Sequence, residues 1–286
     1  MATATDTVGN FGVDFDFDTA GNYTAGVPTA GQVLLLDNAN ASKGIDGEVT
    51  VRIDASALKS FRVGEAWKGH IGDVTTPLAF DCDEDLRFAA GTEEGQVSHF
   101  QVDVVDAFID HKGIHANACI LDNRTVATGN IWHTRGNLQV VGAFDFLRSH
   151  PVVGGGGGAF LEITAAAAIA NLEAIQSRIK NSSGLTTCKI GAGTKLEHLA
   201  GTVVTTEMWD NCEFVMKGGA MTTVFARGGL LDLSQSFTDK TITNLYVWAG
   251  ATVNLNNASG TNSVTNLHIV SGSPTIHQNT GTKIGV

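Results

Sequence analysis

The feature that most constrains the fold is a degenerate repeat in the second half of the chain. Residues 242–248 (ITNLYVW) and 264–270 (VTNLHIV) match in kind at nearly every position. A small-residue turn follows each copy, and residues 186–196 match residues 243–253 at an offset of 57, which corresponds to three coils of 19. Short strands separated by Gly, Asn and Thr at such a period are typical of a parallel β-solenoid. We therefore expect an all-β chain with a right-handed parallel β-solenoid (β-helix) over residues 159–286.

Alternation within the repeats predicts which side chains point into the solenoid, because successive side chains of a strand face opposite sides. The expected inward residues are Leu245, Val247, Leu267 and Ile269. Asn244 and Asn266 recur at one outward register, where stacked amides can bond along the axis. Gly229, Gly250 and Gly272 are expected at the corners, where a positive φ or a close backbone approach is needed.

One segment, residues 163–180, is open to two interpretations. Four apolar residues at helical spacing and a run of four alanines favour a helix by local propensity. However, residues 169–175 (IANLEAI) have the pattern of residues 242–248, including the Asn-Leu pair. Since a repeat outranks local propensity, we favour a solenoid coil, with the helix as the alternative.

Charge is distributed unevenly along the chain. The formal net charge is −11; residues 1–150 hold 10 basic and 21 acidic side chains, whereas residues 151–286 hold eight of each. No basic stripe is available to neutralise phosphates, so nucleic acid is not an expected partner. We predict an extended N-terminal arm (1–50), a β-rich acidic region (51–153) and the solenoid (159–286), joined at the five glycines of residues 154–158.

The arm contains a strictly alternating segment, residues 13–18 (VDFDFD). Val13, Phe15 and Phe17 share one face of the expected strand, and three carboxylates share the other. Few large apolar residues surround this segment, so it cannot build a core of its own. We predict that Val13, Phe15 and Phe17 dock on a partner strand or a neighbouring subunit.

Cysteine spacing and hydropathy indicate the kind of compartment in which the chain is expected. The four cysteines are widely spaced and form no C-x-x-C pair, which favours small buried residues in a reducing compartment over disulfides or a zinc knuckle. No stretch of eighteen apolar residues is present, and the first residues lack the basic and apolar regions of a signal peptide. We expect neither a membrane span nor a membrane partner.

No combination of residues predicts catalysis or metal binding. Residues 14–18 lack the glycine and the bidentate Glu of a calcium loop, and residues 81–85 (DCDED) are interpreted as a solvated acidic loop. His111, His115 and Cys119 have helical spacing, but Gly113 interrupts that helix. The sequence contains no G-x-S-x-G or H-E-x-x-H motif and no acid pair at one register of successive coils. We therefore expect no enzymatic activity, no cofactor and no metal.

Exposed aromatic residues are the remaining candidates for ligand binding. Trp209, Tyr246 and Trp248 could stack on sugar rings. Stacking on the solenoid surface or at an interface is the favoured interpretation.

The repeats TNLYVWAGATVNL and TNLHIVSGS resemble coils of β-helical virion proteins of tailed bacteriophages, over roughly residues 160–286. The resemblance implies a structural protein of the particle, made in the host cytoplasm. We expect a capsid decoration (cement) protein on the capsid exterior. Its expected partners are the major capsid protein and further copies of itself, with which it forms a homotrimer. The alternative is a tail fibre or spike protein that binds, and in some cases cleaves, host surface polysaccharide.

Overall fold

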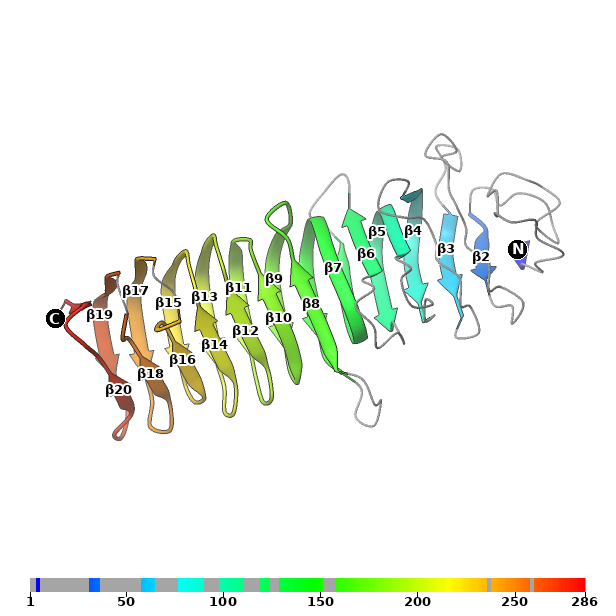
Figure 1. Ribbon diagram of the computed structural model, residues 1–286. Coiled ribbons are helices and arrows are strands. Elements are labelled where there is room, and N and C mark those ends of the chain that lie inside the picture. Colours follow the sequence, from blue (N-terminus) through cyan, green and yellow to red (C-terminus); the bar gives the residue numbers. More distant parts are fainter. Residues whose placement is uncertain are drawn as a thin grey trace. The chain divides into compact units, whose positions relative to one another are not determined.

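The computed structural model describes residues 4–5, 31–36, 58–64, 77–89, 98–110, 119–123, 129–151, 158–235, 238–257 and 260–285. Throughout these segments the regular elements are β-strands, so the fold is all-β, as predicted (Figure 1). A helix long and apolar enough to cross a membrane is not found in them. The chain divides into two compact units, Met1–Asp145 with Val152–Ala159, and Phe146–Pro151 with Phe160–Val286.

The first unit is built from parallel strands. They are β1 (Ala4–Thr5), β2 (Val33–Leu36), β3 (Leu58–Val63), β4 (Leu78–Phe88), β5 (Ser98–Asp110), β6 (Cys119–Asn123) and most of β7 (Asn130–Ser149). Strands β1 to β5 each pair with the next, and β5 then pairs with β6 through its first residues and with β7 through its last. Buried Phe61, Phe88 and Phe100 meet edge to face, with ring centroids 5.2 to 6.2 Å apart.

Parallel coiling in this unit was not predicted, because its period is irregular. Leu34 pairs with Phe61 in the next coil, whereas Leu86 pairs with Ala107, a clearly shorter step along the chain. Bulges interrupt the register between β3 and β4 and between β4 and β5. Of the predicted arm, the structure describes residues 4–5 and 31–36, which contain β1 and β2.

The second unit is the predicted parallel β-solenoid. Its strands are β8 (Ala159–Ile163), β9 (Ala168–Ala174), β10 (Ser177–Asn181), β11 (Leu185–Ile190), β12 (Lys195–His198), β13 (Thr202–Met208), β14 (Glu213–Met216), β15 (Ala220–Ala226), β16 (Leu230–Asp232), β17 (Lys240–Val247), β18 (Thr252–Asn254), β19 (Asn262–Ile269), β20 (Thr275–His277) and β21 (Thr282–Ile284). Odd-numbered strands from β9 to β21 form one parallel ladder, and even-numbered strands from β8 to β20 form a second (Figure 1).

The register confirms the alignments made from the sequence. Thr187 pairs with Thr205, Thr205 with Thr223, and Thr223 with Asn244, so three successive coils of unequal length separate the two segments that the sequence aligned. The ambiguous segment contains strand β9 and is not a helix. Tertiary packing overrides helix propensity here, because Ile169 and Leu172 of β9 pair with residues of β11 and are buried inside the stack. A helix could not form these strand pairs.

Inward positions behave as predicted where a coil lies on both sides. Leu245 and Val247 are fully buried. Leu267 and Ile269 occupy the same register in β19, but Leu267 is only half-buried and Ile269 is 50% exposed. The difference arises because β21 pairs with residues 262–264 of β19 and leaves its second half uncovered.

The corner glycines adopt the left-handed conformation that was expected of them. Gly229, Gly250 and Gly272 have φ values of 73°, 90° and 63°. A Cβ at Gly229 would also overlap the backbone oxygen of Cys212 in the preceding coil. A side chain at this position is therefore excluded both by conformation and by space.

Buried polar and thiol side chains complete the interior. Cys119, Cys188 and Cys212 are buried free thiols, and burial raises the pKa of Cys212 to about 11. At a corner, Asn181 donates from Nδ2 to the Ser183 carbonyl (2.9 Å) and to Nδ1 of His198 (3.0 Å). His198 then carries its proton on Nε2, which lies 3.3 Å from the Gly201 carbonyl oxygen.

Candidate functional site

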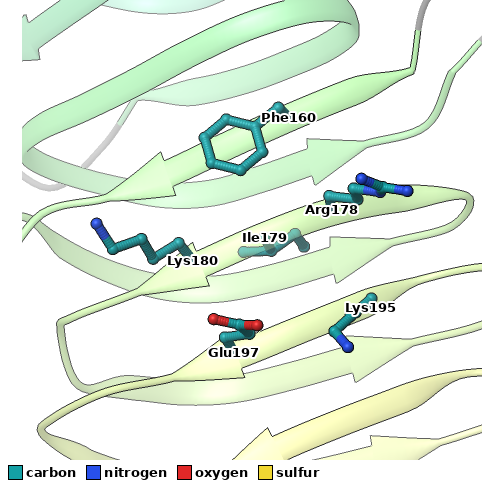
Figure 2. Close-up of a pocket in the computed structure, with 6 residues that line it drawn as sticks. All are labelled: Phe160, Arg178, Ile179, Lys180, Lys195 and Glu197. Carbon is teal, nitrogen blue, oxygen red and sulfur yellow. The ribbon is translucent and has the colours of Figure 1, made fainter.

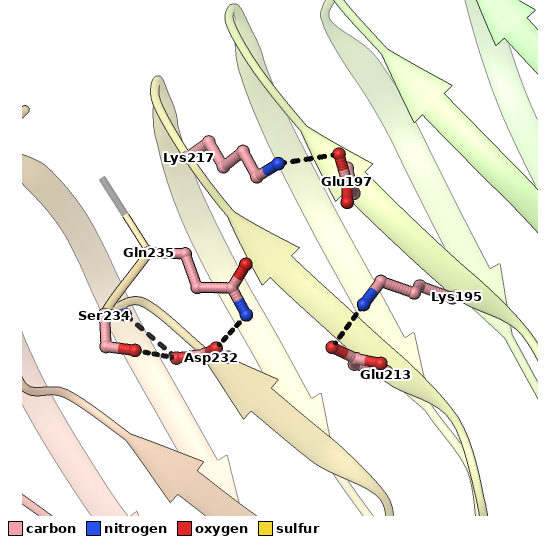
Figure 3. Close-up of polar contacts among 7 residues, drawn as sticks. All are labelled: Lys195, Glu197, Glu213, Lys217, Asp232, Ser234 and Gln235. Atoms are coloured by element: carbon pink, nitrogen blue, oxygen red, sulfur yellow. Dashed lines mark hydrogen bonds and ion pairs between the residues drawn. The ribbon is translucent and has the colours of Figure 1, made fainter.

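Several charged side chains of opposite sign lie beside one another on the outer surface of the even-numbered ladder. The register sets Lys180 beside Glu197, and Lys195 beside Glu213, in neighbouring coils. The Nζ–Oε distances are 2.8 Å for Lys180–Glu162, 2.9 Å for Lys195–Glu213 and 2.8 Å for Lys217–Glu197. Figure 3 shows the last two pairs. A hydrogen bond and the negative charge of Glu162 raise the pKa of Lys180. Each half-exposed pair stabilises the fold by at most about 1 kcal/mol. Because the two members of each pair belong to neighbouring coils, the pairs together link successive coils.

A surface groove of about 360 Å³ interrupts this ladder (Figure 2). It is lined by Phe160, Arg178, Ile179, Lys180, Lys195 and Glu197. Arg178 is exposed and forms no ion pair with any residue that the structure describes, so its guanidinium can donate hydrogen bonds to a carboxylate or phosphate. The two lysines, however, are already neutralised by glutamates, and none of the lining residues has a buried polar atom without a partner. An anion would therefore meet a single surface charge.

The outer surface of the odd-numbered ladder changes from charged to aromatic along one row of paired residues. The row is Glu173, Lys189, Glu207, Phe225, Tyr246 and His268. Tyr246 stacks on His268 with ring centroids 4.5 Å apart and on Phe225 at 5.1 Å. Two positions earlier, Nδ2 of Asn266 donates to Oδ1 of Asn244 at 2.8 Å, which confirms the predicted amide stack. The three rings and the two amides are therefore engaged with one another along the axis.

A second row lies two positions further along each strand, where the odd-numbered strands leave the sheet. It consists of Ile175, Gly191, Trp209, Arg227, Trp248 and Val270, each of whose amides donates to the preceding coil. The Arg227 guanidinium carbon lies 5.0 Å from the ring of Trp209 and 4.8 Å from the ring of Trp248, a cation–π sandwich across three coils. Trp209 nevertheless remains 49% exposed.

A second groove, of about 340 Å³, begins at Trp209. It is lined by Glu173, Ala174, Ile175, Lys189, Ile190, Gly191, Ala192 and Trp209. The groove exists because Gly191 places no side chain between Ile175 and Trp209. The sequence analysis identified Trp209 and missed Gly191 and Arg227. Aligning the residues that follow each odd-numbered strand places both of them in one row with Trp209, and this alignment is the signal that could have identified them.

The acids of the solenoid are held in local structural roles where the structure shows their contacts. Asp232 accepts hydrogen bonds from the backbone amide of Ser234 (2.9 Å), from Oγ of Ser234 (2.7 Å) and from Nε2 of Gln235 (2.8 Å) (Figure 3). This arrangement closes a turn after β16. The side chain of Asp232 therefore holds this turn.

The predicted docking residues Val13, Phe15 and Phe17 lie outside the described part of the chain. The residues that the structure describes contain no group of three or more His, Cys, Asp or Glu side chains able to hold a metal ion. Trp248 and Tyr246 occupy the stacking positions on the solenoid surface that the sequence favoured for them. Trp209 is different, because it is half-exposed and lines the open groove.

Comparison with known proteins finds no matching family model, no matching curated protein and no matching solved structure. The geometry of the described residues and the pattern of the repeats are therefore the basis for a functional proposal.

Proposed function

We propose that this chain is a non-enzymatic structural protein of a tailed-bacteriophage virion, which decorates and stabilises the capsid shell. The observation that carries the proposal is that outward side chains bond from coil to coil along the solenoid. Ion pairs such as Lys195–Glu213, the Asn244–Asn266 amide pair and the Tyr246–His268 stack all run in this direction. A surface whose side chains reinforce the stack suits a rigid exterior module.

The segregation of charge supports a direction of docking. All of the net charge of −11 falls in residues 1–150, and residues 151–286 are neutral overall. The acidic half suits a basic surface of the major capsid protein, because complementary charge speeds encounter and fixes register. The neutral solenoid is then the part left to the solvent. We further propose that the protein is a homotrimer, for which light scattering of the full chain at micromolar concentration gives the mass directly.

The alternative, a tail fibre or spike protein that binds surface polysaccharide, is favoured by one observation. Half-exposed Trp209 borders an open groove on the solenoid, an arrangement that stacking along the axis does not require. Copy number separates the two functions. A decoration protein occurs in purified particles in numbers close to those of the shell protein or its capsomers, whereas a fibre or spike occurs in few copies.

The test combines quantitative mass spectrometry of purified particles with add-back of the protein to particles that lack it. Full-length protein should restore occupancy on the shell. A variant lacking residues 2–31, which removes Val13, Phe15 and Phe17, should bind much less. Undiminished occupancy by the truncated protein would show that the arm is not the anchor, and a low copy number would favour the fibre.

A further inference from the structure

We infer that the groove between Ile175 and Trp209 is a binding site for an uncharged pyranose ring of an oligosaccharide or polysaccharide. The inference rests on the geometry of this groove alone and is independent of where the protein resides. It assigns a ligand to an exposed indole ring whose neighbours on the solenoid surface are otherwise engaged with one another.

The indole ring of Trp209 is presented in a fixed orientation. Arg227, from the following coil, lies over the ring at 5.0 Å and is itself held by Trp248 at 4.8 Å on its other side. A ring held in this way loses little conformational freedom when a ligand stacks on it. The groove borders Trp209 on the side of the preceding coil, whose residue in this row is Gly191.

The spacing of the coils on either side of Gly191 leaves room for a ring of saturated carbons. Ile175 and Trp209 belong to coils two steps apart, which at the usual strand spacing separates their backbones by roughly 9.5 Å. A ring in van der Waals contact on both sides needs roughly 7 to 8 Å. A Cβ at Gly191 would find only Ile175 Cγ1 at 3.5 Å and the Ala174 carbonyl oxygen at 3.9 Å within 4 Å, so protein atoms are sparse above this residue.

The chemistry of the walls favours a sugar over other planar or apolar ligands. The C–H groups on one side of a pyranose carry partial positive charge and meet the negative face of the indole. Glu173 and Lys189 also line the groove. Each takes part in an ion pair, Glu173 with Arg148 and Lys189 with Glu207, and each keeps a further lone pair or N–H group for a sugar hydroxyl, which both donates and accepts. The carboxylates at the groove are each paired with a cation, Glu173 with Arg148 at 3.0 Å and Glu207 with Lys189 at 4.0 Å, so these charges largely cancel and suit an uncharged ligand.

The experiment measures binding of uncharged hexasaccharides to the full-length protein by isothermal titration calorimetry, with indole fluorescence as a second readout. The probes are cellohexaose, laminarihexaose, maltohexaose, mannohexaose and N-acetylchitohexaose. We expect at least one to bind, and we expect Trp209→Ala to weaken that binding by about tenfold or more. Val204→Ala serves as the control, because Val204 is a comparably exposed apolar residue (45%) outside the groove.

A second variant fills the groove without removing the indole ring. Gly191 does not have a positive φ, and a Cβ at this position would make only ordinary van der Waals contacts, so Gly191→Leu fits without backbone strain. This variant should abolish hexasaccharide binding while leaving the thermal midpoint of unfolding unchanged. Binding that survives in Gly191→Leu, or the failure of all five probes to bind the native protein, overturns the proposal. Loss of self-association in Gly191→Leu, with no sugar bound by the native protein, would instead assign the groove to a second copy of the chain.

Discussion

At the scale of single residues, the buried histidine of the solenoid corner makes stability depend on pH. His198 is fully buried and accepts a hydrogen bond on Nδ1 from Asn181, so its neutral form is the one that fits. Burial lowers the pKa of His198 below its ordinary value of 6.5, although the Gly201 carbonyl opposes the shift. Well above pH 6.5 the side chain is neutral in both the folded and unfolded states, and it contributes no pH dependence.

As the pH falls below this ordinary value, the unfolded chain binds a proton at His198 and the folded chain does not. The free energy of unfolding should therefore decrease with falling pH, by at most about 1.4 kcal/mol per pH unit for this group, until the folded pKa is reached. Thermal melts of the native protein and of His198→Gln between about pH 8 and pH 5 test this. The slope should be smaller in the variant, whereas His277→Gln, at an exposed position, should keep the native slope. Equal slopes in all three proteins would contradict the assignment.

At the scale of the strand, stability depends on whether a coil is covered on both sides. Leu245 in β17 and Leu267 in β19 are paired residues with the same side chain and the same inward direction. Leu245 is fully buried between β15 and β19, but Leu267 is half-buried. Leu245→Asp should lower the free energy of unfolding by about 4 kcal/mol or more, since it places an unpaired charge between coils and removes a packed leucine.

The matched substitution Leu267→Asp should cost clearly less, because water still reaches the new carboxylate. Circular dichroism at the strand minimum during chemical denaturation measures both values. Similar losses for the two variants would mean that β19 is covered as completely as β17.

At the scale of the whole molecule, the separation of charge predicts how the proposed docking responds to salt. The acidic half carries the entire net charge, so its attraction to a basic shell surface is long-range and screened. Raising the salt concentration from roughly 0.1 M to 1 M shortens the screening length from roughly 10 Å to roughly 3 Å. Occupancy in the add-back assay should fall over this range without vanishing, since the apolar contacts proposed for Val13, Phe15 and Phe17 are not screened by salt. Occupancy that is insensitive to salt would contradict a role for the acidic half.

Much of the solenoid could be predicted from the sequence because a parallel stack repeats one local environment. The equivalence of residues 186–196 with residues 243–253, and of Ile169 with Ile242, follows from matching residue types at a near-constant period. The coils of the first unit could not be recognised in the same way, because bulges and unequal separations between paired strands erase the period.

By itself, therefore, the sequence determined the fold class, the inward row and the corner glycines, which depend on alternation and period along one chain. Only the tertiary structure decided which side chains meet between coils. Ile175, Gly191, Trp209 and Arg227 each belong to a different coil and become neighbours only when the register of three successive strand pairs is set. The cation–π sandwich and the groove beside it depend on that register, because a glycine creates an open space only with respect to the larger side chains stacked above and below it.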